Sequence, residues 1–481
     1  MSGFSRTRAR RNVAASTAAD QEWRIPAIAK KAAIFAACVA LSVFYVVAAS
    51  EHGRRVNTSK ARGDQSGYLW DAENVYANWH GRQPPVVIGE RNRMPLYAGY
   101  LALFYHPDLS DPAFFEVAKR ANIYLSLTLL GVLGVIFFRE LPGLAAANLT
   151  GILAFGIFVF KAAYAQSELL FYFLMFVTFL GCWHLLRWPR GWRAIVVAAG
   201  TGAVAGLAQL TKAAMLPFVG IFLAVYLWAL ARGLTHPSNG VDRSYAKARS
   251  RLAVAIVFAA AFFIVLWPYL STSKRVFGHY FYNVNSTFYV WYDDWAHASV
   301  GTYSHGDGVG WPTMAESELP SAGRYLRQHT AGQIASRMAS GFADMAIKSV
   351  QMYEYLPYLV MYLLALSIVL VTRSTSVSAM ARANPALLAF LILYAVVYLL
   401  AIAFYYPTSG TGTARFLLAH LAPLFFAISY LLSRTPIEHS PWQVAGMRIG
   451  VRQFQLLVLT VLTVDVAFHL WPRLMTTYGG F

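Results

Sequence analysis

The chain has 481 residues, of which 57% are hydrophobic and only 13% are charged, and its formal net charge is +18. Soluble domains usually carry about 25% charged residues, and a soluble protein this apolar would expose too much hydrophobic surface. The composition therefore excludes a soluble enzyme, a disordered chain, a coiled coil and a disulfide scaffold. The two cysteines, Cys38 and Cys182, both lie in apolar runs, so they indicate neither a disulfide framework nor a zinc site.

Apolar runs are spread from one end of the chain to the other, and those of about 18 to 20 residues are long enough to cross a bilayer as helices. We expect a tail over residues 1–29 and one all-α, polytopic transmembrane domain over residues 30–481. The eleven expected spans lie at about 30–49, 120–138, 143–161, 168–186, 194–211, 214–231, 252–270, 355–372, 385–405, 415–432 and 454–472.

The basic residues predict an orientation. If the N-terminus is cytoplasmic, about half of the 40 Lys and Arg residues fall on the cytoplasmic side with few acids beside them, as the positive-inside rule requires. Topology then explains the net charge, and we expect no nucleic-acid partner. Two long loops, at about 50–119 and 271–353, face the outside. They are rich in aromatic residues and Gly, so we expect them to fold as caps on the membrane domain.

The first outer loop carries the best catalytic candidate. Asp64 lies just beyond the first span, and Asp64, Tyr68 and Asp71 have the i, i+4, i+7 spacing of one helical face. An ordinary helix-capping role for Asp64 is the alternative. Further on, Arg91 and Arg93 precede a short apolar helix that cannot span and is expected on the outer membrane surface.

Three further charged residues lie at the outer ends of expected spans, namely Glu168, Lys212 and Arg415. The two cations could hold an anionic lipid headgroup, or they could simply reach toward lipid headgroups, as basic residues at span ends often do. Among the charged residues, only Asp465 lies well inside a span. Ion-coupled carriers usually place ionisable groups at mid-membrane, so this pattern does not favour one.

Four local patterns resemble the GT-C class of membrane glycosyltransferases, in particular the bacterial relatives of the protein mannosyltransferases and the aminoarabinose transferase. They are the acidic segment with Asp64 and Tyr68, the segment Arg93 to Tyr97, the pair of segments Ser167-Glu168 and Gly206 to Lys212, and Ala414 to Leu418 followed by Pro423. The chain departs from that class at Gln65, where a second acid is common, and at Phe416, where Tyr is common.

The resemblance implies a GT-C-like bundle whose two outer loops bear juxtamembrane helices, and a polyprenyl-phosphate sugar as donor. Asp64 would be the general base that takes a proton from an acceptor hydroxyl, with inversion at the anomeric carbon. Arg91, Arg93, Lys212 and Arg415 would hold the lipid phosphate, and Asp71 would support the acid or touch the acceptor. Glu168 would bind sugar or pair with Lys161. The acceptor would be a glycan, a lipid or a protein on the extracytoplasmic side of a bacterial inner membrane.

The second outer loop leaves alternatives open. Residues 281–295 place aromatic rings beside amides and carboxylates, which suits sugars but also suits an interfacial aromatic belt. Asp293 and Asp294 could bind a divalent metal ion, and the sequence indicates no other cofactor. A transporter or flippase for lipid-linked sugars is one other interpretation. A polymerase or ligase that uses a lipid diphosphate is another, with Arg324, Arg327 and Arg337 as its basic cluster.

Overall fold

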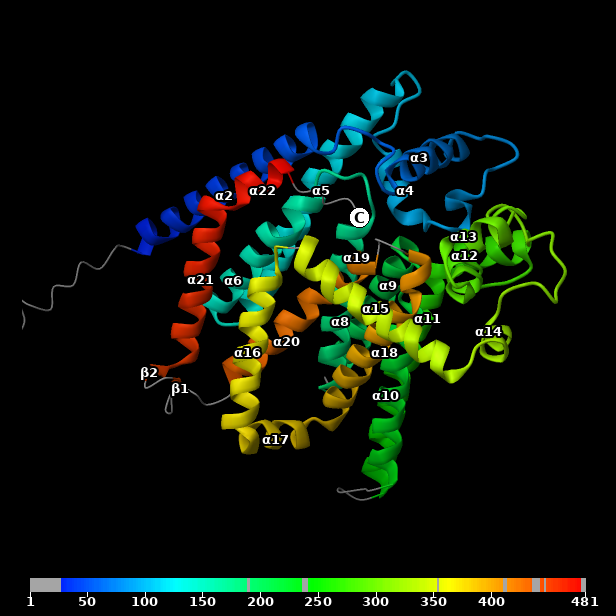
Figure 1. Cartoon of the computed structure of the whole chain (residues 1–481). Helices are drawn as coiled ribbons and strands as arrows, with labels where there is room; N and C mark the ends of the chain where they lie inside the picture. The colour runs from blue at the N-terminus through cyan, green and yellow to red at the C-terminus, as the bar shows by residue number, and fades with distance from the viewer. Residues whose placement is uncertain are drawn as a thin grey trace, which may run out of the picture. The chain divides into compact units, whose positions relative to one another are not determined.

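The computed structural model in Figure 1 describes residues 27–187, 191–235, 241–352, 354–409, 413–434, 442–444 and 447–476. The chain divides into two compact units, Met1–Val47 and Ala48–Phe481, each of which is described by itself. In the first unit, the described residues all belong to helix α2 (Ala27–Arg55), whose last turns are part of the second unit. The predicted tail over 1–29 therefore lies almost entirely outside the described residues.

Helices make up nearly all of the described structure. After α2 they are α3 (Gln65–Trp79), α4 (Pro95–Ala102), α5 (Asp111–Glu140), α6 (Gly143–Leu153), α7 (Val159–Lys161), α8 (Glu168–Leu186), α9 (Trp192–Thr211), α10 (Leu216–Thr235), α11 (Val241–Phe277), α12 (Val284–Thr287), α13 (Trp295–Ala298), α14 (Ala322–Gln328), α15 (Ala331–Met352), α16 (Leu356–Thr372), α17 (Ser374–Ala383), α18 (Pro385–Ser409), α19 (Thr413–Leu418), α20 (Leu421–Arg434), α21 (Val451–Phe468) and α22 (Leu470–Thr476). Two three-residue strands, β1 (Trp442–Val444) and β2 (Met447–Ile449), pair antiparallel. They are a small exception to the predicted all-α fold.

The long helices are apolar enough to make this chain an integral membrane protein. Among the described residues, nine helices have the length and hydropathy to cross a membrane. The number becomes ten if α15 and α16, which meet at a 115° bend, form one broken span. The expected span at 214–231 corresponds to α10. Its apolar part, Leu216–Arg232, is shorter than the nine helices counted above. Each of the eleven predicted runs thus lies on one helix or on two or three successive helical segments, while the exact number of spans stays a prediction.

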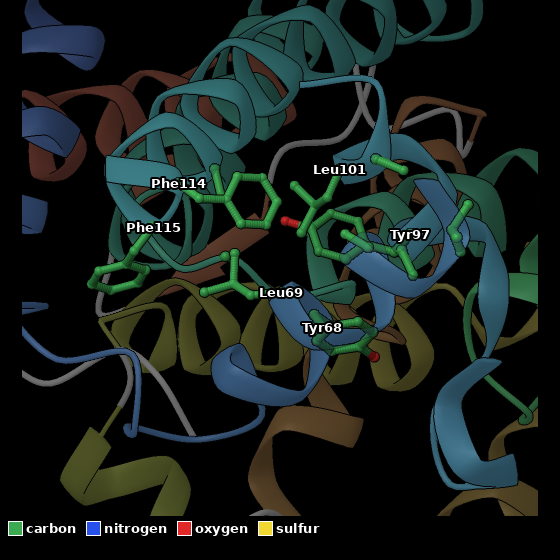
Figure 2. Close-up of a cluster of buried hydrophobic side chains, with 12 residues drawn as sticks. Tyr68, Leu69, Tyr97, Leu101, Phe114 and Phe115 are labelled. Carbon is green, nitrogen blue, oxygen red and sulfur yellow. The ribbon is translucent and has the colours of Figure 1, made fainter. Parts of the chain in front are cut away.

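The first outer loop folds against α5 as predicted for a cap. Residues of α3, α4 and α5 form one buried cluster, in which Tyr68 and Leu69 face Tyr97 and Leu101, and Phe114 closes one side (Figure 2). Helix α4 is present where a short helix was expected. One face of it, formed by Tyr97, Ala98, Leu101 and Ala102, is at most 2% exposed and packs inside the protein, while Leu96 and Tyr100 are partly exposed. Its place on the membrane surface stays a prediction.

The second outer loop has a small core of its own. The rings of Phe277, Tyr282 and Phe288 are buried together with Tyr289, and the rings of Phe277 and Tyr282 stack 4.2 Å apart. A membrane-interface belt would expose these rings, so that interpretation is wrong for this buried group. The same loop contains the short helices α12, α13 and α14. Its place as a cap on the membrane domain stays a prediction.

Helices α9 and α11 approach closely through small residues. Gly202 and Gly206 are four residues apart on α9, and each faces the backbone of α11, at Phe258 and Phe262 respectively. Close helix contacts of this kind are common in membranes, because small residues let two backbones pack tightly. Since Lys212 directly follows α9, this contact also fixes the position of that ammonium group.

We predict that Gly202→Ala destabilises the protein by about 1–3 kcal/mol, the usual cost of overpacking a tight core. The added Cβ would overlap the carbonyl oxygen of Phe258, whereas a Cβ at Gly200 on the same helix meets nothing within 4 Å. Gly200→Ala is therefore the matched control. Cys182 is buried and Cys38 is exposed, so in a Cys38→Ser background the reaction of Cys182 with a thiol dye reports thermal unfolding. Equal unfolding temperatures for the two alanine variants would contradict the close contact.

Candidate active site

Gln65 fixes the start of α3 against the connection between α7 and α8. Its buried amide exchanges two hydrogen bonds with the amide of Asn57, at 2.8 and 2.9 Å, and accepts one from the backbone N–H of Ala165 at 3.0 Å. Asn57 also donates to the carbonyl oxygen of Ala163. A glutamate at position 65 could not donate to Asn57. The amide that departs from the GT-C pattern therefore has a structural role, and it holds the neighbouring Asp64 close to Glu168.

Asp64 stands at the N-terminal end of α3 but does not cap it. Its side chain makes no capping hydrogen bond within the described chain, and it accepts a hydrogen bond from Arg415 Nη1 at 2.8 Å instead. The carboxylate is 41% exposed, so it is open to solvent on one side and paired with a cation on the other. The capping role considered from the sequence is not the one this carboxylate has.

Arg415 and Lys212 meet at Glu168, as the sequence order of the spans predicts for residues at one end of the bundle. Lys212 Nζ lies 3.0 Å from Glu168 Oε1, and Arg415 Nη1 lies 3.7 Å from the same oxygen. Glu168 is only 2% exposed. Burial lowers the pKa of the Lys212 ammonium, while the nearby charge of Glu168 opposes that shift. A desolvated carboxylate held between two cations is the centre of the site.

A third cation belongs to this cluster. Lys161, the last residue of α7, is buried, and its charge interacts with those of Glu168, Arg415, Lys212 and Asp64. The group therefore contains three basic side chains and two carboxylates. The sequence indicated Lys161 only as a partner for Glu168. Its position at the end of an apolar run, on the same side as Lys212, is the signal that could have identified it.

Aromatic side chains complete the surroundings of the charged group. Tyr68 OH lies 2.7 Å from Ser167 Oγ, beside Glu168. Burial raises the pKa of the Tyr68 hydroxyl, and the carboxylates of Glu168 and Asp64 raise it further, so Tyr68 is a neutral group here. The ring of Phe416 lies under both cations, 4.9 Å from Lys212 Nζ and 5.4 Å from Arg415 Cζ. Cations over an aromatic face are attracted by its quadrupole, so Phe416 helps to hold them in place.

Asp71 and Arg93 form a separate pair on the same cap. Arg93 Nε donates to Asp71 Oδ2 at 2.7 Å, and Asp71 is 1% exposed. Burial alone would lower the pKa of the Arg93 guanidinium, but the charge and the hydrogen bond of Asp71, with smaller contributions from Tyr68 and Asp64, together hold the pKa above its ordinary value. Gly67 leaves room for this guanidinium, since a Cβ there would overlap it. The geometry therefore makes this pair an internal support of the loop that carries Asp64.

Arg91 does not join the charged cluster. Its guanidinium lies 4.1 Å from the ring centroid of Tyr269 and 5.5 Å from that of Phe277. Arg91 is 3% exposed, and burial lowers the pKa of its guanidinium. The sequence grouped Arg91 with the phosphate-binding cations, but the structure does not bring it together with Lys212 and Arg415, because its side chain turns onto the end of α11.

Among the acidic and basic candidates of the second outer loop, Asp293 and Arg337 come together, with Arg337 Nη1 3.8 Å from Asp293 Oδ1. Asp294 caps the backbone N–H of His297, while Asp293 Oδ1 lies 3.0 Å from His329 Nε2. Arg337 is buried and donates to the carbonyl oxygens of Phe404 and Val290, whereas Arg327 is exposed. The described residues contain no group of three or more His, Cys, Asp or Glu side chains placed to hold a metal ion.

The fold and this site define an all-α polytopic membrane protein with a buried cluster of opposite charges at one end of its helices. No protein-family model matches the sequence, and a search of curated proteins finds no match either.

We predict that Asp71→Ala destabilises the protein by about 3 kcal/mol, because removing one partner of a buried ion pair leaves the other charge without compensation. Double replacement with Arg93→Met is expected to recover part of that loss. Asp108→Ala serves as the control, because that side chain is 90% exposed. Thermal unfolding in detergent gives the comparison. If Asp71→Ala and Asp108→Ala unfolded at the same temperature, the supporting role of the pair would be wrong.

Proposed function

We propose that the chain is a glycosyltransferase that moves a sugar from a polyprenyl-phosphate donor to an acceptor hydroxyl on the extracytoplasmic side of a bacterial inner membrane. One observation carries the proposal. A partly exposed carboxylate, Asp64, is held 2.8 Å from Arg415 in a cluster that also contains Lys212 and Glu168, at the ends of apolar helices. Such a cluster suits a lipid phosphate at the membrane boundary, with a base beside it.

The chemistry divides between the acid and the cations. Asp64 takes the proton of the acceptor hydroxyl as that oxygen attacks the anomeric carbon, and the bond from that carbon to the phosphate oxygen breaks. Arg415 and Lys212 stabilise the charge that develops on the leaving phosphate, because fixed cations in a desolvated site act strongly on a developing anion. Glu168 keeps the two cations in position and neutralises part of their charge. A single displacement of this kind inverts the anomeric configuration.

The Arg415–Asp64 contact gives the steps an order. Before the donor binds, Arg415 donates to the carboxylate that must act as the base. A phosphate offers oxygens that match a guanidinium at least as well as a carboxylate does. Donor binding therefore transfers Arg415 to the phosphate and releases Asp64 for the acceptor proton, so the base becomes active only when a donor is present.

We predict that Asp64→Asn lowers kcat about 10²–10⁴-fold, the usual contribution of general base catalysis, while donor affinity is kept or increased. Removing the negative charge of Asp64 leaves Arg415 without a competitor for the phosphate. Arg415→Met is expected to weaken donor binding instead. The measurement is sugar transfer by purified protein in nanodiscs, supplied with a panel of labelled polyprenyl-phosphate sugars and a cell-envelope acceptor fraction.

Asp294→Asn is the matched control, since that carboxylate caps a turn in the second outer loop. Full transfer by Asp64→Asn would exclude Asp64 as the base. Movement of the labelled lipid across vesicles without transfer would favour a flippase. Activity with lipid diphosphates alone would favour a polymerase or ligase.

A further inference from the structure

A group of neutral polar side chains lies beside the charged cluster and has no part in the chemistry described above. It consists of Asn92 in the first outer loop, Asn285 in the second outer loop and Tyr405 on α18. The Tyr405 hydroxyl donates to Asn285 Oδ1 at 2.9 Å. Asn285 Nδ2 donates to Asn92 Oδ1 at 2.8 Å and to the carbonyl oxygen of Asn92 at 3.1 Å. Residues from three remote segments therefore meet in one hydrogen-bonded chain.

This chain adjoins the candidate active site through Phe416. The ring of Tyr405 packs edge-on against that of Phe416 at 5.8 Å. The same ring also contacts the cations Lys212 and Arg415. The Tyr405 hydroxyl also interacts electrostatically with the charges of Arg415 and Asp64. A ligand held by the two cations would thus have the amide and phenol groups next to it.

Holding the two loops together does not require Asn285. That task is done by Asn283, which is buried, donates to the carbonyl oxygen of Arg91 at 2.9 Å, and caps the backbone N–H groups of Asn285 and Ser286. The side chain of Asn92 is exposed, and those of Asn285 and Tyr405 are only half-buried. The polar atoms of the chain can therefore exchange their mutual hydrogen bonds for bonds to a ligand.

We propose that Asn92, Asn285 and Tyr405 form a subsite that binds the hydroxyl groups of a pyranose sugar. Amides and phenols both donate and accept, which matches a sugar hydroxyl, and they carry no charge that would favour phosphate. The adjacent cations are suited to the anionic part of a ligand. The neutral polar groups would therefore bind the sugar, and the cations would bind the charged part.

The sugar could belong to the donor or to the acceptor, and its assignment to either rests on the proposed function. Binding of a free sugar does not rest on it. The first experiment is therefore saturation-transfer NMR on the detergent-solubilised full chain with a panel of methyl pyranosides. Tyr405→Phe is the decisive variant, because it removes one hydroxyl and keeps the ring against Phe416. Asn285→Ala is the second variant. Ser286→Ala is the control in the same turn, with only a weak side-chain contact at 3.4 Å.

We expect the parent protein to transfer saturation to at least one pyranoside. Both test variants should bind that pyranoside about tenfold more weakly, the usual effect of losing one or two hydrogen bonds. Ser286→Ala should bind as the parent does. Absence of saturation in the parent, or equal affinity in Tyr405→Phe, would overturn the subsite. A parent that binds the pyranoside but transfers no sugar from any lipid phosphate would keep the subsite and refute the proposed function.

Two further measurements identify the source of the sugar. If the subsite holds the donor sugar, Tyr405→Phe weakens binding of a sugar-bearing polyprenyl phosphate about tenfold and leaves binding of bare polyprenyl phosphate unchanged. If it holds the acceptor, both lipids bind as before and only the KM for the acceptor rises. Equal weakening of both lipids would mean that the variant disturbs the cations, and that result would count against the subsite.

Discussion

The contact between Arg415 and Asp64 is the interaction on which the site depends. It joins the first outer loop to the start of α19. Arg415 and Lys212 both lie near Glu168, so the same cluster also connects α8 and the end of α9. Charges are costly to remove from water unless they are paired. The cluster satisfies that requirement by pairing Arg415 and Lys212 with Asp64 and Glu168, so each charge lies near an opposite one.

The parts of the fold that the sequence predicted are those that the membrane dictates. A bilayer core has no water to satisfy backbone groups, so long apolar runs must be helical. Successive spans cross the membrane in opposite directions, so counting the spans is enough to tell which span ends lie on the same side. That count predicts Asp64, Glu168, Lys212 and Arg415 at one end of the bundle. The contacts among these four residues bear out that placement, while the side of the membrane they face stays a prediction.

The parts that could not be predicted depend on contacts between segments remote in sequence. Arg91 and Arg93 stand two residues apart, yet one turns onto the ring of Tyr269 and the other onto Asp71. The local sequence does not distinguish the two arginines. Their different partners depend on the positions of Tyr269 on α11 and Asp71 on α3 in the folded protein. The aromatic residues of the second outer loop had the composition of an interfacial belt. Tyr282, Phe288 and Tyr289 instead form a buried group with Phe277, and composition does not distinguish these rings from exposed ones such as Phe281 and Trp295.

The order of chain synthesis adds a consequence to the Asp64–Arg415 contact. The two residues are separated by 351 positions, whereas Lys212 and Glu168 are separated by 44. During synthesis the Glu168–Lys212 pair can form early, within one stretch of newly inserted helices. Asp64 must wait for nearly the whole polypeptide to leave the ribosome before its cation arrives. The nascent protein therefore completes its charged centre last, and a prematurely ended chain that lacks α19 retains the acid without its counter-ion.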